Sequence, residues 1–175
     1  EVLDTLRERD RDEVARCWRI VANEGDAVWF PYLPVSPAEA SAAVDVLSPR
    51  MHDGRCALAT ARVDGERLGW VALDRNPTPV AAHWATIRHL QTLPDARGTG
   101  IGSELLEAVV DHARTLGVEQ IQLSGRGGEG LESFYGERGW RVVGRHPGGL
   151  RLADGDRDEV IMLRELTDPV RTESW

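Results

Sequence analysis

The stretch Arg97-Gly98-Thr99-Gly100-Ile101-Gly102 decides how this chain of 175 residues is interpreted. Three glycines alternate within it, directly after Leu93-Pro94 and directly before an apolar pattern with helical spacing. Glycine lets a backbone approach a ligand closely because no Cβ stands in the way. The start of a helix adds unpaired N–H groups and the positive end of the helix dipole. The stretch therefore predicts a phosphate-binding turn at a helix N-terminus.

The residues around this turn show which kinds of phosphate-binding motif it can and cannot be. A P-loop needs a lysine followed by serine or threonine, but none of the 21 basic residues of this chain is a lysine. The same absence excludes a pyridoxal Schiff base and a lysine nucleophile. A dinucleotide fingerprint needs a third glycine where Ser103 stands, although Glu119 lies at the distance of a ribose-binding acid. A dinucleotide site and a purely structural glycine-rich turn are therefore the alternatives that these residues leave open.

Two segments of the chain resemble the marks of one family. Residues 90–102 are similar to the acetyl-CoA signature of the GNAT superfamily of N-acetyltransferases, Gln/Arg-x-x-Gly-x-Gly/Ala, which is met by Arg97, Gly100 and Gly102. Downstream, Phe134-Tyr135-Gly136-Glu137-Arg138-Gly139-Trp140 resembles the family's Phe/Leu-Tyr-x-x-x-Gly-Phe segment. The two segments stand in the family's order and at its usual separation, and the resemblance covers residues 55–166.

Composition and charge narrow the class of protein. Hydrophobic residues make up 41% and charged residues 29% of the chain, which is typical of a globular domain with one core. The net charge of −8 disfavours binding to nucleic acid or to an anionic membrane, because both attract basic surfaces. Cys17 and Cys56 are too few for a disulfide framework. The opening residues carry no basic-then-apolar signal, so we expect a cytoplasmic location. We also expect a monomer or homodimer, and a site that holds no metal.

Apolar periodicity and turn residues predict one domain over residues 1–166 and a C-terminal tail over residues 167–175. We expect helices over residues 10–23, from Pro37 to a point before Pro49, over 101–116 and over 131–138, with Ser36 as a helix cap. Strands are expected over residues 2–6, 56–63, 67–73, 83–93, 118–123, 140–144 and 160–166, with a loop between the last two. This order predicts a mixed α/β sheet. The resemblance implies the GNAT acyl-CoA N-acyltransferase fold, a mostly antiparallel sheet with a splayed central strand pair.

The resemblance also implies how acetyl-CoA is held. Backbone groups of three strand residues would pair with its pantetheine arm, namely Leu90, Gln91 and Thr92. Backbone N–H groups of the turn and the first helical residues would hold its pyrophosphate: Gly98, Thr99, Gly100, Ile101, Gly102 and Ser103. Arg97 would add positive charge to this site.

Tyr135 is the expected general acid toward the CoA thiolate. A phenol with an ordinary pKa of about 10 stays protonated at neutral pH, so it can donate a proton. Periodicity alone favours a different interpretation, in which Tyr135 is a packed aromatic residue beside Phe134. The family segment is what assigns the catalytic role.

The general base is not determined by the sequence. The positions where many relatives carry a base hold Thr86, Arg88, Leu123 and Ser124 here, and Gly128 replaces a common asparagine. His89 and His83 lie on the predicted strand and have the right chemistry, and a strand bulge could aim His89 at the site. Both histidines can equally be structural, and reaction through a water or without a dedicated base is a further alternative.

The acceptor side carries an aromatic cluster, Trp29, Phe30 and Tyr32, in a loop that walls the acceptor site of the family. Aromatic side chains can stack on a ring or a cation.

We expect transfer of an acetyl group from acetyl-CoA to a primary amine of a small molecule, such as an antibiotic, toxin or metabolite, by direct attack in a ternary complex. The closing segment, residues 153–163, resembles ribosomal-protein and tabtoxin-type acetyltransferases, so a protein N-terminus is an alternative acceptor. A catalytically idle acyl-CoA-binding module is the alternative from another functional class.

Overall fold

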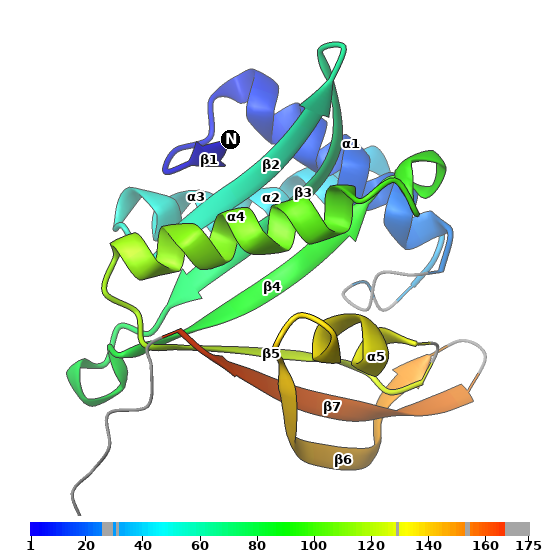
Figure 1. Cartoon of the computed structure of the whole chain (residues 1–175). Coiled ribbons are helices and arrows are strands. Elements are labelled where there is room, and N and C mark those ends of the chain that lie inside the picture. The colour runs from blue at the N-terminus through cyan, green and yellow to red at the C-terminus, as the bar shows by residue number, and fades with distance from the viewer. Residues whose placement is uncertain (26–29, 31, 129, 153–154, 167–175) are drawn as a thin grey trace, which may run out of the picture.

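The chain forms one seven-stranded sheet in the order β1-β2-β3-β4-β5-β7-β6 (Figure 1). The computed structural model describes residues 1–25, 30, 32–128, 130–152 and 155–166. The pair β4–β5 is parallel and every other neighbouring pair is antiparallel. The strands are β1 (Val2–Leu3), β2 (Cys56–Val63), β3 (Glu66–Arg75), β4 (Trp84–Thr92), β5 (Gln120–Arg126), β6 (Arg141–Leu152) and β7 (Gly155–Glu165). The predicted mixed α/β fold, mostly antiparallel, is thereby confirmed.

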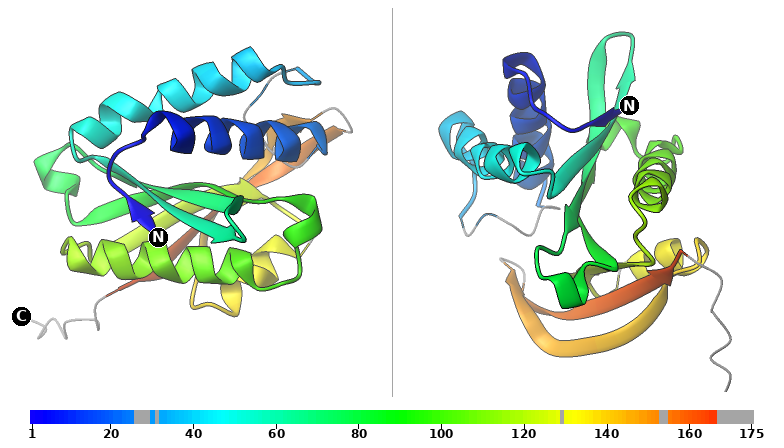
Figure 2. Two further views of the ribbon diagram at one scale, coloured as in Figure 1. Left: turned by 90° about the horizontal axis from the view of Figure 1, so that it is seen from above. Right: turned by 90° about the vertical axis from the view of Figure 1, so that its left-hand side faces the viewer.

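Helices cover both faces of the upper part of the sheet. They are α1 (Glu8–Asn23), α2 (Pro37–Asp45), α3 (Leu47–His52), α4 (Ile101–Thr115) and α5 (Leu131–Gly136). Figure 2 shows α1 and α2 on one face of the sheet and α4 on the opposite face. Each layer has its own apolar cluster against the sheet. No helix among the described residues combines the length and the apolarity needed to cross a bilayer.

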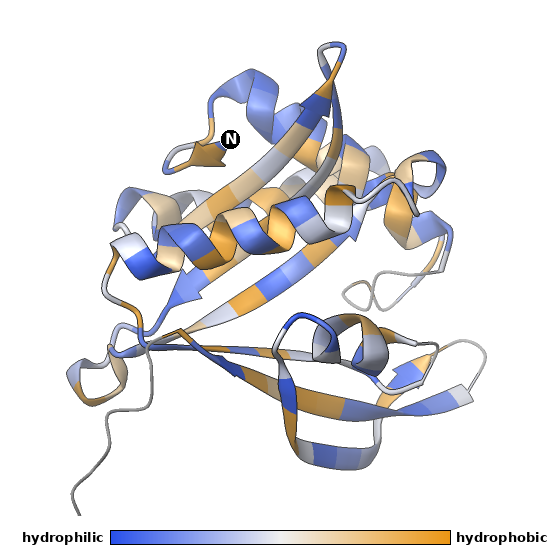
Figure 3. Ribbon diagram, viewed as in Figure 1, coloured by the Kyte–Doolittle hydropathy of each residue, from blue (hydrophilic) through white to orange (hydrophobic). Residues whose placement is uncertain are grey.

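The amphipathic pattern of α4 explains why this helix packs where it does. Its buried side chains recur at helical spacing, as expected of a helix that packs one face against a sheet: Leu105, Leu106, Val109, Val110 and Ala113. Figure 3 shows apolar and polar residues interleaved along this helix. The helix begins at Gly100, which has a φ of +95° that glycine tolerates best. The packing of α4 therefore fixes the position of the glycine turn in front of it.

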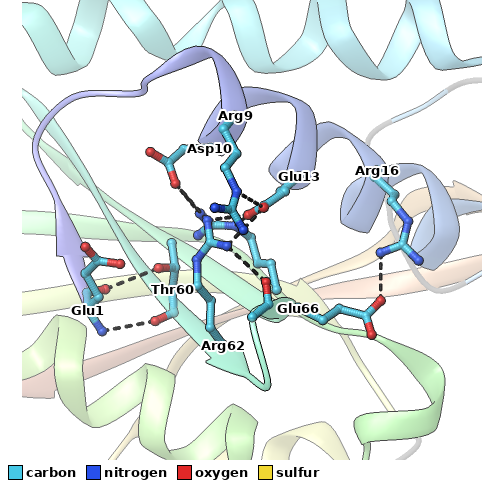
Figure 4. A network of polar contacts seen from close by, with 10 residues as sticks. Glu1, Arg9, Asp10, Glu13, Arg16, Thr60, Arg62 and Glu66 are labelled. Atoms are coloured by element: carbon cyan, nitrogen blue, oxygen red, sulfur yellow. Dashed lines mark hydrogen bonds and ion pairs between the residues drawn. The ribbon is translucent and has the colours of Figure 1, made fainter.

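A network of ion pairs joins α1 to the β2–β3 hairpin (Figure 4). Asp10 accepts hydrogen bonds from Arg62 at 2.9 Å and from Arg67 at 2.6 Å. Glu13 accepts from the same two arginines, and from Arg9 at 2.8 Å. The Arg67 side chain is almost fully buried, and a buried charge is tolerated when it is paired in this way. The network holds the start of α1 against the hairpin on the side away from the glycine turn.

The structure differs from the predicted elements in two places. The helix expected to end before Pro49 does so, at Asp45, but a helix that was not predicted, α3, follows it and contains Pro49 in its first turn. Proline fits there because the first N–H groups of a helix have no intrahelical acceptor. The predicted loop between the last two strands is wrong, because β6 and β7 form one long hairpin with a register shift between His146 and Leu150. Pairing with β7 overrides the glycines at 148 and 149, which are accommodated in this irregular part of β6.

The central strands β4 and β5 pair over a short distance and then separate. Their register runs from Trp84↔Gln120 to Thr86↔Gln122. Beyond Thr86, β4 continues beside β3, whereas β5 continues beside β7. The sheet therefore opens from this point, as the splayed strand pair of the predicted fold requires.

Candidate active site

A cleft of about 940 Å³ lies at the opening between β4 and β5. It brings together residues of α1, β4, the glycine turn, the start of α4, β5, α5 and the β6–β7 hairpin. Most of the residues predicted to bind acetyl-CoA line this cleft, namely Leu90, Gln91, Thr92, Arg97, Gly98, Gly100, Gly102 and Ser103. The predicted catalytic residues His89 and Tyr135 line it as well. Thr99 and Ile101 belong to the same turn but are not among the residues that line the cleft.

The glycine turn lines the cleft with Gly98, Gly100 and Gly102. Gly98 and Gly100 have φ values of +74° and +95°, and an added Cβ would meet no atom within 4 Å at either position. Thr99 is exposed, and its hydroxyl donates a hydrogen bond to the Ala96 carbonyl at 2.6 Å. The first hydrogen bonds of α4 run from the N–H groups of Ser103 and Glu104 to the Gly100 carbonyl. The preceding N–H groups lie at the positive end of the helix, which is the arrangement that suits a pyrophosphate.

The edge of β4 that faces the cleft is suited to pair with an extended ligand. A bulge places His89 and Leu90 opposite one residue of β3, because Trp70 pairs with Gln91 and Ala72 pairs with Arg88. The Gln91 side chain is buried, and its Oε1 has no hydrogen-bond partner among the described residues. An open strand edge together with a buried acceptor fits the amide groups of a pantetheine arm.

Tyr135 lies on α5, on the other wall of the cleft. Its ring makes edge-to-face contacts with Phe134 at 5.1 Å and with Trp140 at 5.9 Å between ring centroids. Burial raises the pKa of Tyr135 to about 12. The phenol is therefore protonated throughout the neutral range, which is the state that a proton donor needs.

Arg138 ties the short helix α5 to the start of α4. Its Nε and Nη2 donate to the Ser103 hydroxyl at 3.1 and 2.8 Å, and its Nη1 donates to the Phe134 carbonyl at 2.6 Å. The guanidinium also lies 4.0 Å from the centre of the Phe134 ring. Arg138 lines the cleft, so it adds a positive charge beside the glycine turn. The sequence analysis named Arg138 within the tyrosine segment but did not assign it a role.

His89 is held in an aromatic environment at the bulge. It has a left-handed φ of +59°, and its ring lies 4.6 Å from Trp18 and 5.6 Å from Trp70 between centroids. Burial, together with the charges of Arg88 and Arg50, lowers the pKa of His89 to about 4. The imidazole is therefore neutral at physiological pH.

Two of the predicted acceptor aromatics, Phe30 and Tyr32, lie away from the lining of the cleft. Phe30 packs edge-to-face on Trp18 at 5.4 Å, and the Tyr32 side chain is 82% exposed. Trp29 lies outside the described residues. Neither Phe30 nor Tyr32 is among the residues that line the cleft.

Charged and polar side chains line the cleft beyond the glycine turn and Tyr135. Arg88 of β4, Ser124 and Arg126 of β5, Glu159 of β7 and Leu150 of β6 line it. Glu159 is the one carboxylate among the described lining residues, and it makes no ion pair with another described residue. Glu159 could not be identified as a site residue from local sequence patterns, because its position depends on the length and register of the final hairpin. Among the described residues, no three His, Cys, Asp or Glu side chains are placed to hold a metal ion.

Solved structures with this fold include several acetyltransferases. The ribosomal-protein-alanine N-acetyltransferase of Brucella melitensis is 18% identical, with a TM-score of 0.79 over 94% of this chain and 99% of that one. YncA of Salmonella typhimurium, a putative acetyltransferase solved with acetyl-CoA, is 14% identical, with a TM-score of 0.78 over 100% and 98% of the two chains. A putative phosphinothricin N-acetyltransferase is 19% identical, with a TM-score of 0.75 over 96% and 99%.

These likenesses show the fold, and the family is shown by the sequence itself. The model of the acetyltransferase (GNAT) family matches residues 18–140, a range that contains β4, the glycine turn and Tyr135. The chain therefore belongs to the GNAT family of N-acetyltransferases.

Proposed function

We propose that this protein transfers the acetyl group of acetyl-CoA to the primary amine of a small molecule, with Tyr135 as the general acid. The observation that carries the proposal is that the glycine turn, the open edge of β4 and Tyr135 all line one cleft. Binding of acetyl-CoA is supported by the N–H groups at the start of α4 and by the unpartnered Oε1 of Gln91. When bound, acetyl-CoA supplies the activated acetyl group.

The reaction requires two proton transfers that residues of this chain would carry out, one from the attacking amine and one to the leaving thiolate. The attacking amine must lose a proton, and we assign its acceptance to Glu159, whose negative charge also attracts an ammonium group. The amine nitrogen forms a bond to the acetyl carbon as the bond from that carbon to sulfur breaks. Tyr135 donates its phenolic proton to the leaving thiolate. His89 is a less suitable base than Glu159, because a neutral imidazole packed on Trp18 and Trp70 does not attract an ammonium group.

A small-molecule acceptor is supported by the side chains on the acceptor side of the cleft. Arg88, Arg126 and Glu159 present charges of both signs within one cavity, which suits a small zwitterionic or polar amine. A protein N-terminus is the second candidate, and the solved ribosomal-protein-alanine N-acetyltransferase is the reason to include it in the test. The aromatic loop at Trp29 stays a prediction for acceptor recognition.

Replacement of Tyr135 by phenylalanine tests the mechanism. The variant keeps the ring contacts with Phe134 and Trp140 but loses the proton, so turnover should fall by about 10²- to 10⁴-fold. Affinity for acetyl-CoA, measured by calorimetry, should change little. Thiol release should be followed with a panel of small amines and with peptides carrying a free N-terminus. Turnover of Tyr135→Phe at the wild-type rate would show that Tyr135 only packs.

A further inference from the structure

A second, smaller pocket adjoins the acceptor side of the cleft and is rich in arginine. Its volume is about 160 Å³, which is room for about five water molecules. It is lined by Arg50, Arg55, Asp74, Arg75, Asn76, Pro77, Trp84, Thr86 and Arg88. Two of these residues, Thr86 and Arg88, also line the cleft. The two cavities therefore meet at β4, at the point where β4 and β5 separate.

The strand register places the polar groups of this pocket on one face of the sheet. Asp74 of β3 pairs with Thr86 of β4, and Ala72 pairs with Arg88. Cross-strand partners point to the same face, so Asp74, Thr86 and Arg88 share it. Arg50 of α3 reaches the same place from the helical layer and pairs with Asp74.

The charges in the pocket are not balanced. Asp74 is buried, and its Oδ2 accepts from Arg88 Nε at 3.1 Å as well as contacting Arg50. One carboxylate thus faces two guanidinium groups. Arg75 makes no ion pair or side-chain hydrogen bond with another described residue, and Arg55 pairs with the exposed Asp53. The lining contains four arginines and one aspartate, in a protein whose net charge is −8.

The Arg88 guanidinium is hydrogen-bonded through one nitrogen, and its other two nitrogens can still act as donors. Its Nε is taken by Asp74, whereas its two terminal nitrogens make no hydrogen bond with another described residue. The side chain is 47% exposed, at the boundary of the two cavities. A guanidinium that is fixed at one nitrogen and open at the others is suited to bind a carboxylate or phosphonate through two hydrogen bonds.

We propose that this pocket is an anion subsite, and that the acceptor carries a carboxylate or phosphonate group close to its primary amine. This inference rests on the proposed function and specifies its substrate class as amino acids and their phosphonate analogues. Arg88 directly precedes His89 and Leu90 at the open edge of β4, so an anion on Arg88 leaves the amine within a few bonds of the transfer site. Glu159, on the same cleft, faces the ammonium end of such a zwitterion.

The experiment compares amino acids with their own amides, which lack the anionic group. Aliphatic and aromatic L-amino acids, each with its α-amide, are tested for thiol release with acetyl-CoA and for binding to the CoA complex by calorimetry. The wild-type protein should prefer the acids by about 10- to 100-fold in kcat/KM and in affinity, as expected for a hydrogen bond between charged groups. Arg88→Gln should lose this preference, and Arg88→Lys should retain part of it.

Arg114→Gln is the matched control, because Arg114 also pairs with a single aspartate and is 43% exposed, but lies on α4 outside both cavities. This variant should keep the full preference. Transfer without a preference for the acids, or a preference that survives Arg88→Gln, would overturn the subsite and leave the proposed function standing. Preferential binding of the acids without any transfer would support the subsite and overturn the proposed function. Absence of both binding and transfer with every pair would overturn the subsite as well.

Discussion

Acidification should destabilise this protein through His89. The ring contacts Trp18 and Trp70, and burial, with the charges of Arg88 and Arg50, lowers its pKa to about 4. In the unfolded chain an imidazole titrates near pH 6.5. Between these two values the unfolded state binds a proton that the folded state does not bind. The free energy of unfolding therefore decreases as the pH falls through this window.

The size of the effect follows from the two pKa values. The linkage amounts to about 2 kcal/mol at pH 5 and about 3 kcal/mol at pH 4, and partial exposure of the ring reduces both figures. At pH 7 the contribution is only about 0.2 kcal/mol, because the imidazole is then mostly neutral in the unfolded state as well. A variant without a titrating group at position 89 should lack this part of the acid sensitivity.

Denaturant unfolding of the wild type and of His89→Asn, at pH 7 and at pH 5, measures this contribution. Asparagine tolerates the left-handed φ of +59° and does not titrate in this range. The difference at pH 7 reports lost packing, and by pH 5 it should shift by about 2 kcal/mol in favour of the variant. His83→Asn is the control, since His83 is exposed and its replacement should leave the pH dependence unchanged. The reasoning fails if the difference between His89→Asn and wild type is the same at both pH values. It also fails if kcat/KM shows a break near pH 6.5 that His89→Asn removes.

Two further predictions concern the cleft. Gly100→Val forces a β-branched residue into a φ of +95°, which should displace the turn. The affinity for CoA, measured by calorimetry, should fall by about 10-fold or more. Gly54→Val is the control, because it imposes comparable strain at a φ of +67° away from the cleft and should leave the affinity unchanged. Equal affinities of the two variants would remove the glycine turn from the CoA site. Glu159→Gln should lower turnover by about 10²- to 10⁴-fold with little change in acetyl-CoA affinity, and the remaining rate should increase with pH until the acceptor amine is deprotonated. A wild-type rate in Glu159→Gln would show that Glu159 is not the base, and that the proton leaves through water or from an amine that is already neutral.

The parts of the site that are local in sequence could be predicted from the sequence. The alternating glycines and the helical stripe after them lie within a few residues of one another, so their geometry depends little on the remainder of the fold. The same is true of the capping box in which Ser36 and Glu39 bind each other at the start of α2. The strands with strong apolar patterns were also placed within a few residues of their observed bounds.

The parts that depend on pairing between distant segments could not be predicted. The bulge at His89 arises from the register between β3 and β4, and only that register puts the ring against Trp18 and Trp70. Glu159 and Arg88 are ordinary surface residues in the sequence, and the splay of β4 from β5 is what places both at one cavity. The glycines at 148 and 149 indicate a loop when considered alone, although β7 holds that segment in a strand.

The short contact between β4 and β5 has a consequence for how the molecule unfolds. The segment that contains β5, α5, β6 and β7 joins the rest of the sheet through the few residue pairs that end at Thr86↔Gln122. Backbone amides at this junction should therefore exchange with solvent sooner than those of β2 and β3, which pair over most of their length. A ligand that contacts both sides of the opening protects the junction, and each tenfold rise in its concentration above Kd adds about 1.4 kcal/mol to stability. The lifetime of this protein against proteolysis would then rise and fall with the supply of acetyl-CoA.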